Sequence, residues 1–175
     1  MKKTALLCGI VLAGAAAALV AGLRAAGKAD MPGFFGLGTL LADVNITLEV
    51  LLVLGLTVGM ALARRGNIEA HRVNQTAWVM VNAVLVALIM VGSIRAFKLA
   101  HVSDLLNPGN FIIVAHAVVG TLTFAAGTWL VLQMNDILPP RLHVRNWKNL
   151  MRLTLAGYWI VAILGIATYR AWYAE

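Results

Sequence analysis

Residues 39–63 read TLLADVNITLEVLLVLGLTVGMALA, and this stretch decides the fold because most of its side chains are apolar. A helix needs about 20 mostly apolar residues to cross the ~30 Å hydrocarbon core of a bilayer. The most polar side chains of the stretch, Asp43, Asn45 and Glu49, all lie in its first half. It therefore predicts a membrane-spanning helix whose first half carries a polar face.

Four further apolar runs have sufficient length, and they cover residues 4–26, 73–97, 111–134 and 150–172. Backbone amides in lipid must be paired internally, which leaves helices or closed barrels. The runs are too long for barrel strands of about ten alternating residues. We predict an all-α polytopic membrane protein with five transmembrane helices: residues 1–27 form an anchor helix, and residues 39–173 form a four-helix core bundle.

The composition agrees with a membrane protein, since 61% of the residues are hydrophobic and 12% are charged. The net charge of +7 comes from basic residues beside the helix ends, where lipid headgroups explain them better than nucleic acid does. The single cysteine, Cys8, excludes an intrachain disulfide and any CxxC site.

The basic residues also predict an orientation. If the N-terminus is cytoplasmic, that side holds Lys2, Lys3, Arg64, Arg65, Arg72, Arg141, Arg145, Lys148 and Arg152. The other side then holds Arg24, Lys28, Arg95, Lys98 and Arg170. Cytoplasmic loops carry the excess of Lys and Arg, so we expect the N-terminus inside and the C-terminus outside.

All four histidines fall at or near the two membrane faces. In this orientation His71 and His143 lie on the cytoplasmic side, and His116 and His101 lie on the outer side. Imidazoles from different helices can supply the two axial ligands of a heme iron, so all four are candidate cofactor ligands. The alternatives are headgroup contacts for His71 and His143 and a hydrogen bond between helices for His116.

Asn45 and Glu49 are four residues apart, which places them on one helix face. A carboxylate this deep in a membrane is costly unless it is neutral, paired or hydrated, and Arg95 is the nearest candidate cation. Together with His116, these side chains predict an outer polar pocket. The set could ligate a metal ion through His116, Glu49 and Asn45, or contact a heme edge or a quinone headgroup.

Several sequence motifs are absent from the chain. There is no glycine-rich phosphate loop, no HExxH, no GxSxG and no CxxCH heme-attachment sequence. Hydrolytic and nucleotide-dependent chemistry therefore has no support, and we expect a protein without catalytic residues.

Four stretches in the last four predicted helices resemble a family of small bacterial membrane proteins, the CtaM-like family. They are TLLADVN at residues 39–45, RRGNIEAHR at 64–72, FIIVAH at 111–116, and His143 followed by YW at 158–159 and GIATY at 165–169. Family members often carry a histidine near the outer end of the third helix. Here that region reads Arg95-Ala96-Phe97-Lys98, with His101 beyond it. Either His101 substitutes from further out or that ligand is lost.

The resemblance implies a role in maturing cytochrome c oxidase, in the inner (cytoplasmic) membrane of a bacterium. We therefore expect an accessory or assembly subunit of a respiratory electron-transfer complex, surrounded by lipid and other membrane subunits, that handles heme b or copper. One alternative is a b-type heme electron carrier that uses His71 with His143 and His116 with His101. A purely structural lipid-facing subunit is the other.

Overall fold

The computed structural model describes residues 2–97 and 101–173, and these residues are almost entirely helical. In chain order the elements are α1 (Lys2–Ala25), α2 (Leu40–Arg64), α3 (Ile68–Leu85), the π-helix η1 (Val86–Met90), α4 (Val91–Ala96), the 3-10 helix η2 (Val102–Leu106), α5 (Pro108–Met134), the 3-10 helix η3 (Pro140–Leu142) and α6 (Trp147–Tyr173).

Within the described residues, five helices are long and apolar enough to span a membrane. The third of them, Ile68–Arg95, runs continuously through α3, η1 and α4. The predicted all-α class with five membrane-spanning helices is therefore confirmed, and the chain is a multi-pass membrane protein.

Capping side chains set where three of these helices begin. Thr39 accepts a hydrogen bond from the amide of Ala42 at the start of α2, and Asn67 caps α3 in the same way. Asn107 caps α5, whose first residue is the proline Pro108. Such side chains satisfy amides that lack helical partners, and proline suits the first helical position. As a result α3 and α5 begin several residues before the apolar runs that predict them.

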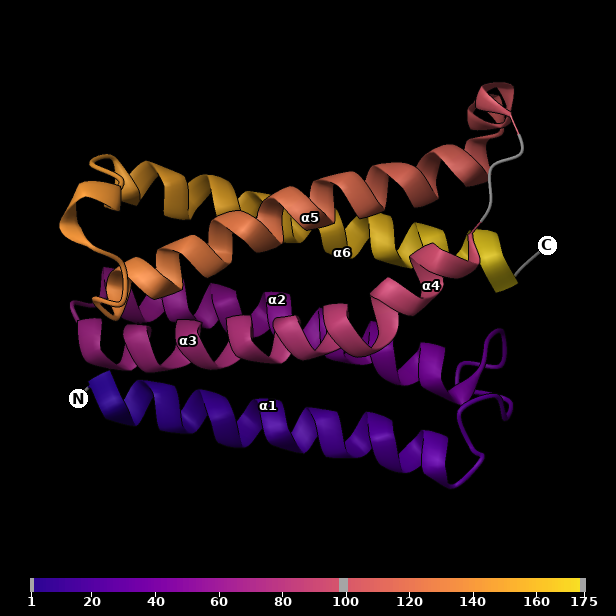
Figure 1. The fold of residues 1–175 in the computed structure, drawn as a ribbon, viewed down its shortest axis with the longest axis horizontal. Coiled ribbons are helices and arrows are strands. Elements are labelled where there is room, and N and C mark those ends of the chain that lie inside the picture. Colours follow the sequence, from indigo (N-terminus) through magenta and orange to yellow (C-terminus); the bar gives the residue numbers. More distant parts are fainter. Residues whose placement is uncertain (1, 98–100, 174–175) are drawn as a thin grey trace.

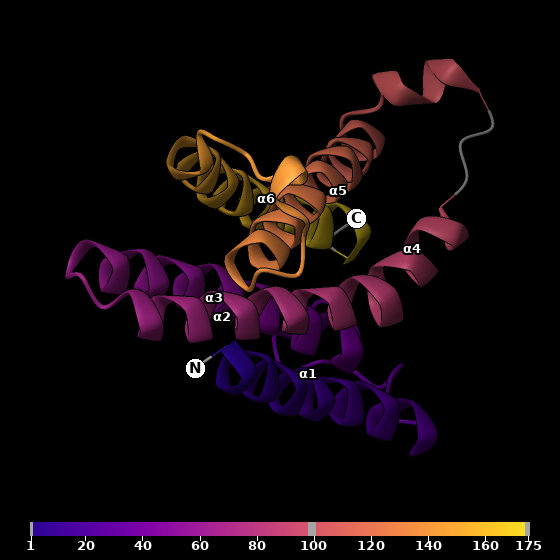
Figure 2. The ribbon, with the colours of Figure 1, turned by 60° about the vertical axis from the view of Figure 1, so that its left-hand side comes forward.

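The helices form three layers (Figures 1 and 2). The first helix, α1, is one outer layer, α2 and α3 form the middle layer, and α5 and α6 form the other outer layer. The N-terminus, the α2–α3 turn and the α5–α6 loop lie at one end of the molecule. The α1–α2 loop, α4 and the C-terminal end of α6 lie at the opposite end.

Two apolar cores hold the layers together. One joins the middle layer to α5 and α6 through Leu52, Val53, Leu56, Val79, Val131, Tyr158 and Ala162. The other joins α1 to α3 and η1 through Ala16, Val20, Val81, Leu85 and Ile89. The sequence predicts an anchor helix, residues 1–27, that is separate from a four-helix core, residues 39–173. Because α1 shares an apolar core with α3, this separation stays a prediction.

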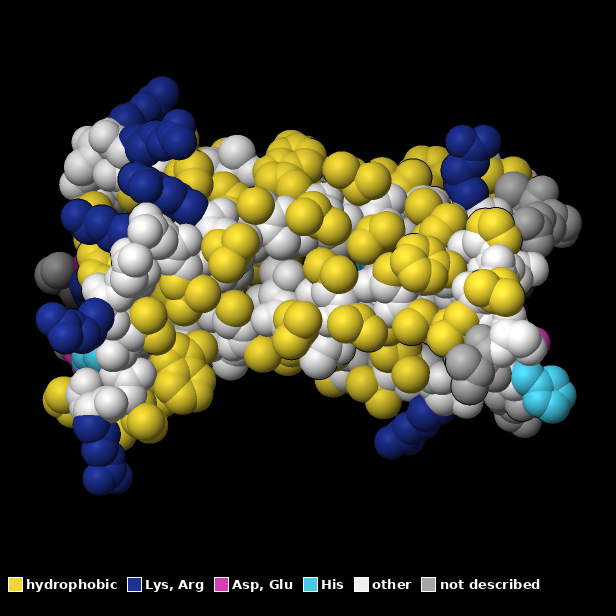
Figure 3. All heavy atoms as spheres, turned by 90° about the horizontal axis from the view of Figure 1, so that it is seen from above, with side chains coloured by type: hydrophobic (Ala, Val, Ile, Leu, Met, Phe, Trp, Pro, Cys, Tyr) yellow, Lys and Arg dark blue, Asp and Glu magenta, His cyan; other side chains and the backbone are white. Residues whose placement is uncertain are grey.

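Basic side chains gather at both ends of the molecule, and Figure 3 shows a broad apolar band between them. The basic side chains are denser at the end that holds the N-terminus. This distribution is typical of a protein that spans a bilayer. The orientation itself stays a prediction, and Lys98, assigned to the outer side, lies outside the described residues.

Candidate functional site

Most of the candidate residues border one of two cavities that are formed by described residues. The His71 cavity has a volume of about 390 Å³, and its wall includes His71, Arg72, His143, Thr154 and Tyr158. The Glu49 cavity has a volume of about 840 Å³, and its wall includes Asn45, Glu49, Asn82, His116, Tyr158 and Thr168. Both volumes fall within the roughly 300–1,000 Å³ of small-molecule and cofactor sites.

The imidazole of His71 is fixed by a backbone carbonyl of the neighbouring helix. His71 lies in the first turn of α3 and only 4% of its surface is exposed. Its Nδ1 donates to the carbonyl oxygen of Gly59 on α2 over 2.8 Å, because a carbonyl can only accept. Nε2 of the neutral ring is then left with a free lone pair. Metal-ligating histidines commonly have their other ring nitrogen oriented in this way.

His143 lies in the α5–α6 loop, just after η3, and borders the same cavity. Its Nε2 donates to the carbonyl oxygen of Leu138 over 3.0 Å, which leaves Nδ1 as the free acceptor. The structure therefore brings the predicted pair, His71 and His143, to one cavity. Each imidazole keeps one ring nitrogen available.

Two further polar atoms in the wall of the His71 cavity are buried without a partner, Arg72 Nε and Thr154 Oγ1. The guanidinium of Arg72 contacts Glu69 at 3.5 Å through its Nη1. Buried polar atoms without partners are rare in proteins, so such atoms in a cavity wall mark where a ligand's polar group would bind.

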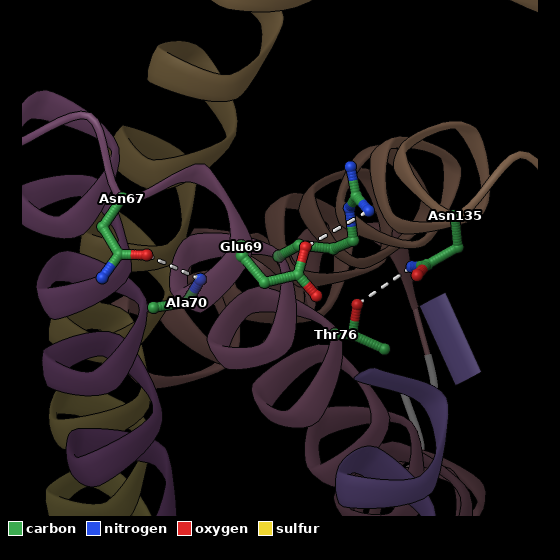
Figure 4. A network of polar contacts seen from close by, with 6 residues as sticks. Asn67, Glu69, Ala70, Thr76 and Asn135 are labelled. Atoms are coloured by element: carbon green, nitrogen blue, oxygen red, sulfur yellow. Dashed lines mark hydrogen bonds and ion pairs between the residues drawn. The ribbon is translucent and has the colours of Figure 1, made fainter. Parts of the chain in front are cut away.

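The start of α3 is held in place by the polar contacts drawn in Figure 4. Asn67 accepts a hydrogen bond from the amide of Ala70 over 3.1 Å. Further along the helix, Asn135 donates to the hydroxyl of Thr76 over 3.0 Å and so ties the end of α5 to α3. These contacts fix the position of His71.

In the Glu49 cavity, Asn45 and Glu49 lie on one face of α2, as their spacing predicts, and their side chains are joined by a hydrogen bond. Asn45 Nδ2 donates to Glu49 Oε1 over 2.8 Å. Glu49 is 9% exposed, and no basic side chain of the described residues forms an ion pair with it. Arg95, the candidate cation, is exposed and does not line this cavity. The carboxyl group is thus buried with an amide as its partner and no cation.

His116, on α5, borders the same cavity as Glu49. Its Nδ1 donates to the carbonyl oxygen of Val161 on α6 over 3.2 Å, which leaves Nε2 free. His116 is eight residues into α5 and Glu49 nine residues into α2, so both lie about 12–14 Å from the same end.

Gly165 on α6 is the residue over which Glu49 and His116 meet. A Cβ at this position would lie 2.6 Å from Glu49 Oε2 and 3.2 Å from His116 Cε1. Only a residue without a side chain leaves room for both groups. The structure therefore brings together His116, Glu49 and Asn45, the three side chains of the predicted outer pocket.

His101 is not brought to this pocket. It is exposed, precedes η2 and lines neither cavity. Its backbone amide donates to Asp104 Oδ2 over 2.9 Å, which caps the short helix η2 at the end of the molecule. The predicted pairing of His116 with His101 therefore has no geometric support, because His116 borders the Glu49 cavity and His101 does not.

In residues 2–97 and 101–173, no three His, Cys, Asp or Glu side chains lie close enough to hold a metal ion. The wall of the Glu49 cavity offers the imidazole of His116 and the carboxyl groups of Glu49 and Asp30, and Asn45 is the further oxygen ligand of the predicted set.

The sequence did not point to three other features. Tyr158 borders both cavities and accepts a hydrogen bond from Asn82. Asp43 is fully buried and accepts hydrogen bonds from the Tyr169 hydroxyl and the Phe35 amide. The π-helix η1 also lines the Glu49 cavity, and π-helices inside long helices often mark functional sites.

Comparisons of the chain with protein-family models, with curated proteins and with solved structures found no match. The functional argument therefore depends on the geometry of the two cavities.

Proposed function

We propose that the chain is an accessory or assembly membrane protein of a respiratory electron-transfer complex, and that it handles heme at the His71 cavity. The observation that supports this function best is the placement of His71 and His143 on one cavity, each with a free ring nitrogen. The type of complex is suggested by the resemblance to the CtaM-like family, which also suggests a bacterial inner membrane with other membrane subunits as partners.

The residues of the His71 cavity fit heme by their chemistry. The imidazoles of His71 and His143 would hold the heme iron. The guanidinium of Arg72, which is partly exposed and whose buried Nε lacks a partner, would bind a propionate. Heme would supply a redox-active iron there. Copper, the other candidate, finds the same two imidazoles but no third His, Cys, Asp or Glu ligand among the described side chains.

A b-type heme electron carrier is the second candidate. It is favoured by histidines on two cavities that share Tyr158. Since His101 lines neither cavity, the Glu49 cavity has one imidazole, and a second heme there lacks its predicted second ligand. A purely structural lipid-facing subunit is the third candidate and predicts no cofactor.

The test is a dithionite-reduced minus oxidised spectrum of protein purified from heme-replete cells. We expect heme bands in the wild type and in His101→Ala, which serves as the matched control. His71→Ala and His143→Ala should lose them while retaining helical circular dichroism. A wild type without heme bands contradicts the heme proposal, and a spectrum unchanged in both variants contradicts the assignment of the ligands.

Deletion of the gene tests the accessory role. We expect a lower spectroscopic content of the terminal oxidase with unchanged transcripts. Normal oxidase content in the deletion strain contradicts this role. If heme is nevertheless present in the purified protein, the electron carrier becomes the better interpretation.

A further inference from the structure

The Glu49 cavity differs from the His71 cavity in its hydrogen-bonding character. Two atoms in its wall are placed to accept a hydrogen bond: His116 Nε2 and Asn45 Oδ1. The first is free because Nδ1 donates to Val161. The second is buried without a partner, because the amide nitrogen of Asn45 donates to Glu49 instead.

These acceptors come from two helices on different sides of the cavity. Asn45 and Glu49 project from α2 in the middle layer, and His116 projects from α5 in the outer layer. Both the carboxyl group and the imidazole lie against Gly165 on α6. A ligand that pairs with both Asn45 Oδ1 and His116 Nε2 would have to donate hydrogen bonds in two directions.

Much of the remaining wall is apolar or aromatic, with Phe97, Ile113, Phe124 and Trp172 among its residues. It also carries hydroxyl groups, such as those of Tyr158 and Thr168, which can either donate or accept. The polar group lies about 12–14 Å along membrane-spanning helices from the nearer end. A ligand that reaches it must therefore be soluble in the bilayer. The cavity, with a volume of about 840 Å³, has room for a ring and part of an apolar tail.

We propose that the Glu49 cavity binds a membrane hydroquinone, and that it prefers the reduced form of the ligand to the oxidised quinone. The two hydroxyl groups of a hydroquinone are donors and would pair with His116 Nε2 and with Asn45 Oδ1. The carbonyl groups of the oxidised quinone only accept, so they leave these buried acceptors unpaired. This site does not depend on heme at the His71 cavity.

The experiment is an anaerobic calorimetric titration of the detergent-solubilised protein with decylubiquinol and, separately, with decylubiquinone. We expect the reduced form to bind at least about tenfold more tightly, since one buried acceptor left unpaired costs enough for that ratio. Equal affinity for the two forms, tighter binding of the oxidised form, or no binding of either overturns the proposal.

Variants locate the site. His116→Ala and Asn45→Ala should each weaken decylubiquinol binding by about tenfold and reduce the preference for the reduced form. His101→Ala is the matched control, because it removes an exposed histidine that lines neither cavity. Unchanged binding in both cavity variants overturns the assignment. The wild-type comparison needs no variant, so a variant that fails to fold does not block the test.

The heme proposal is tested separately in the same protein. His71→Ala should lose the heme spectrum and keep the binding of decylubiquinol. His71→Ala could instead lose both the heme spectrum and the binding of decylubiquinol while it keeps its helicity. The two sites would then not be independent, and the hydroquinone proposal would be wrong even though the wild type binds heme.

Discussion

Tyr158 on α6 accepts a hydrogen bond from Asn82 on α3, with 3.1 Å between Asn82 Nδ2 and Tyr158 Oη. Both side chains are buried, and Tyr158 borders both cavities. On α5, a Cβ at Gly127 would lie 2.6 Å from Tyr158 Oη, so the glycine makes room for the hydroxyl. This contact therefore joins three helices at the place where the two cavities adjoin.

The first prediction concerns the strength of this contact. Tyr158→Phe should lower the free energy of unfolding by about 1 kcal/mol, because it leaves the buried amide of Asn82 without its partner. Equilibrium unfolding in mixed micelles measures the change. Asn82→Ala in the Tyr158→Phe background should cost less than Asn82→Ala alone. Strictly additive effects would show that the hydrogen bond contributes nothing.

The second prediction concerns Gly165. Gly165→Ala should displace Glu49 or His116, because its Cβ would lie 2.6 Å from Glu49 Oε2. We expect decylubiquinol binding to fall by about tenfold or more. Gly120→Ala is the matched control, since it also borders the Glu49 cavity but its Cβ would meet only Val161 Cγ1 at 3.8 Å. Equal effects of the two alanines would contradict a specific role for Gly165.

The third prediction concerns the buried carboxyl group of Asp43, which ties the α1–α2 loop and α6 to α2. Asp43→Ala removes the acceptor for the Tyr169 hydroxyl and the Phe35 amide. We expect a loss of about 2 kcal/mol in unfolding free energy and faster proteolysis within residues 26–38. The control is Asp30→Ala in the same loop, where the side chain is exposed and the change should stay within about 0.5 kcal/mol.

The fourth prediction concerns orientation in the membrane. In a Cys8→Ala background, a cysteine at Lys28 should react with an impermeant maleimide in intact cells. A cysteine at Arg145 should react only after permeabilisation, since the denser basic end is expected in the cytoplasm. Both positions are exposed and lie at opposite ends of the molecule. The reverse pattern would invert the predicted orientation, and labelling of both in intact cells would contradict the alternation of the helices.

Much of the candidate site could be predicted because its information is local. The spacing of four residues places Asn45 and Glu49 on one face of α2, and the hydrogen bond between them follows. The apolar run that begins at residue 111 predicts a shallower position for His116 than for Glu49. The start of α5 at Pro108 brings the two residues to similar depths. The position of His101 could not be predicted in this way, because it lies outside the long helices, where periodicity does not apply.

The sequence by itself determined five membrane-spanning helices, since hydropathy and backbone hydrogen bonding in lipid allow little else. Only the tertiary structure decided which helices touch, and so that His71 shares a cavity with His143 and that Gly165 admits Glu49 beside His116. The physical reason is that lipid tails are as apolar as leucine. Hydropathy therefore does not predict which helices are neighbours. The contacts between helices depend instead on close packing at small residues and on hydrogen bonds from one helix to another.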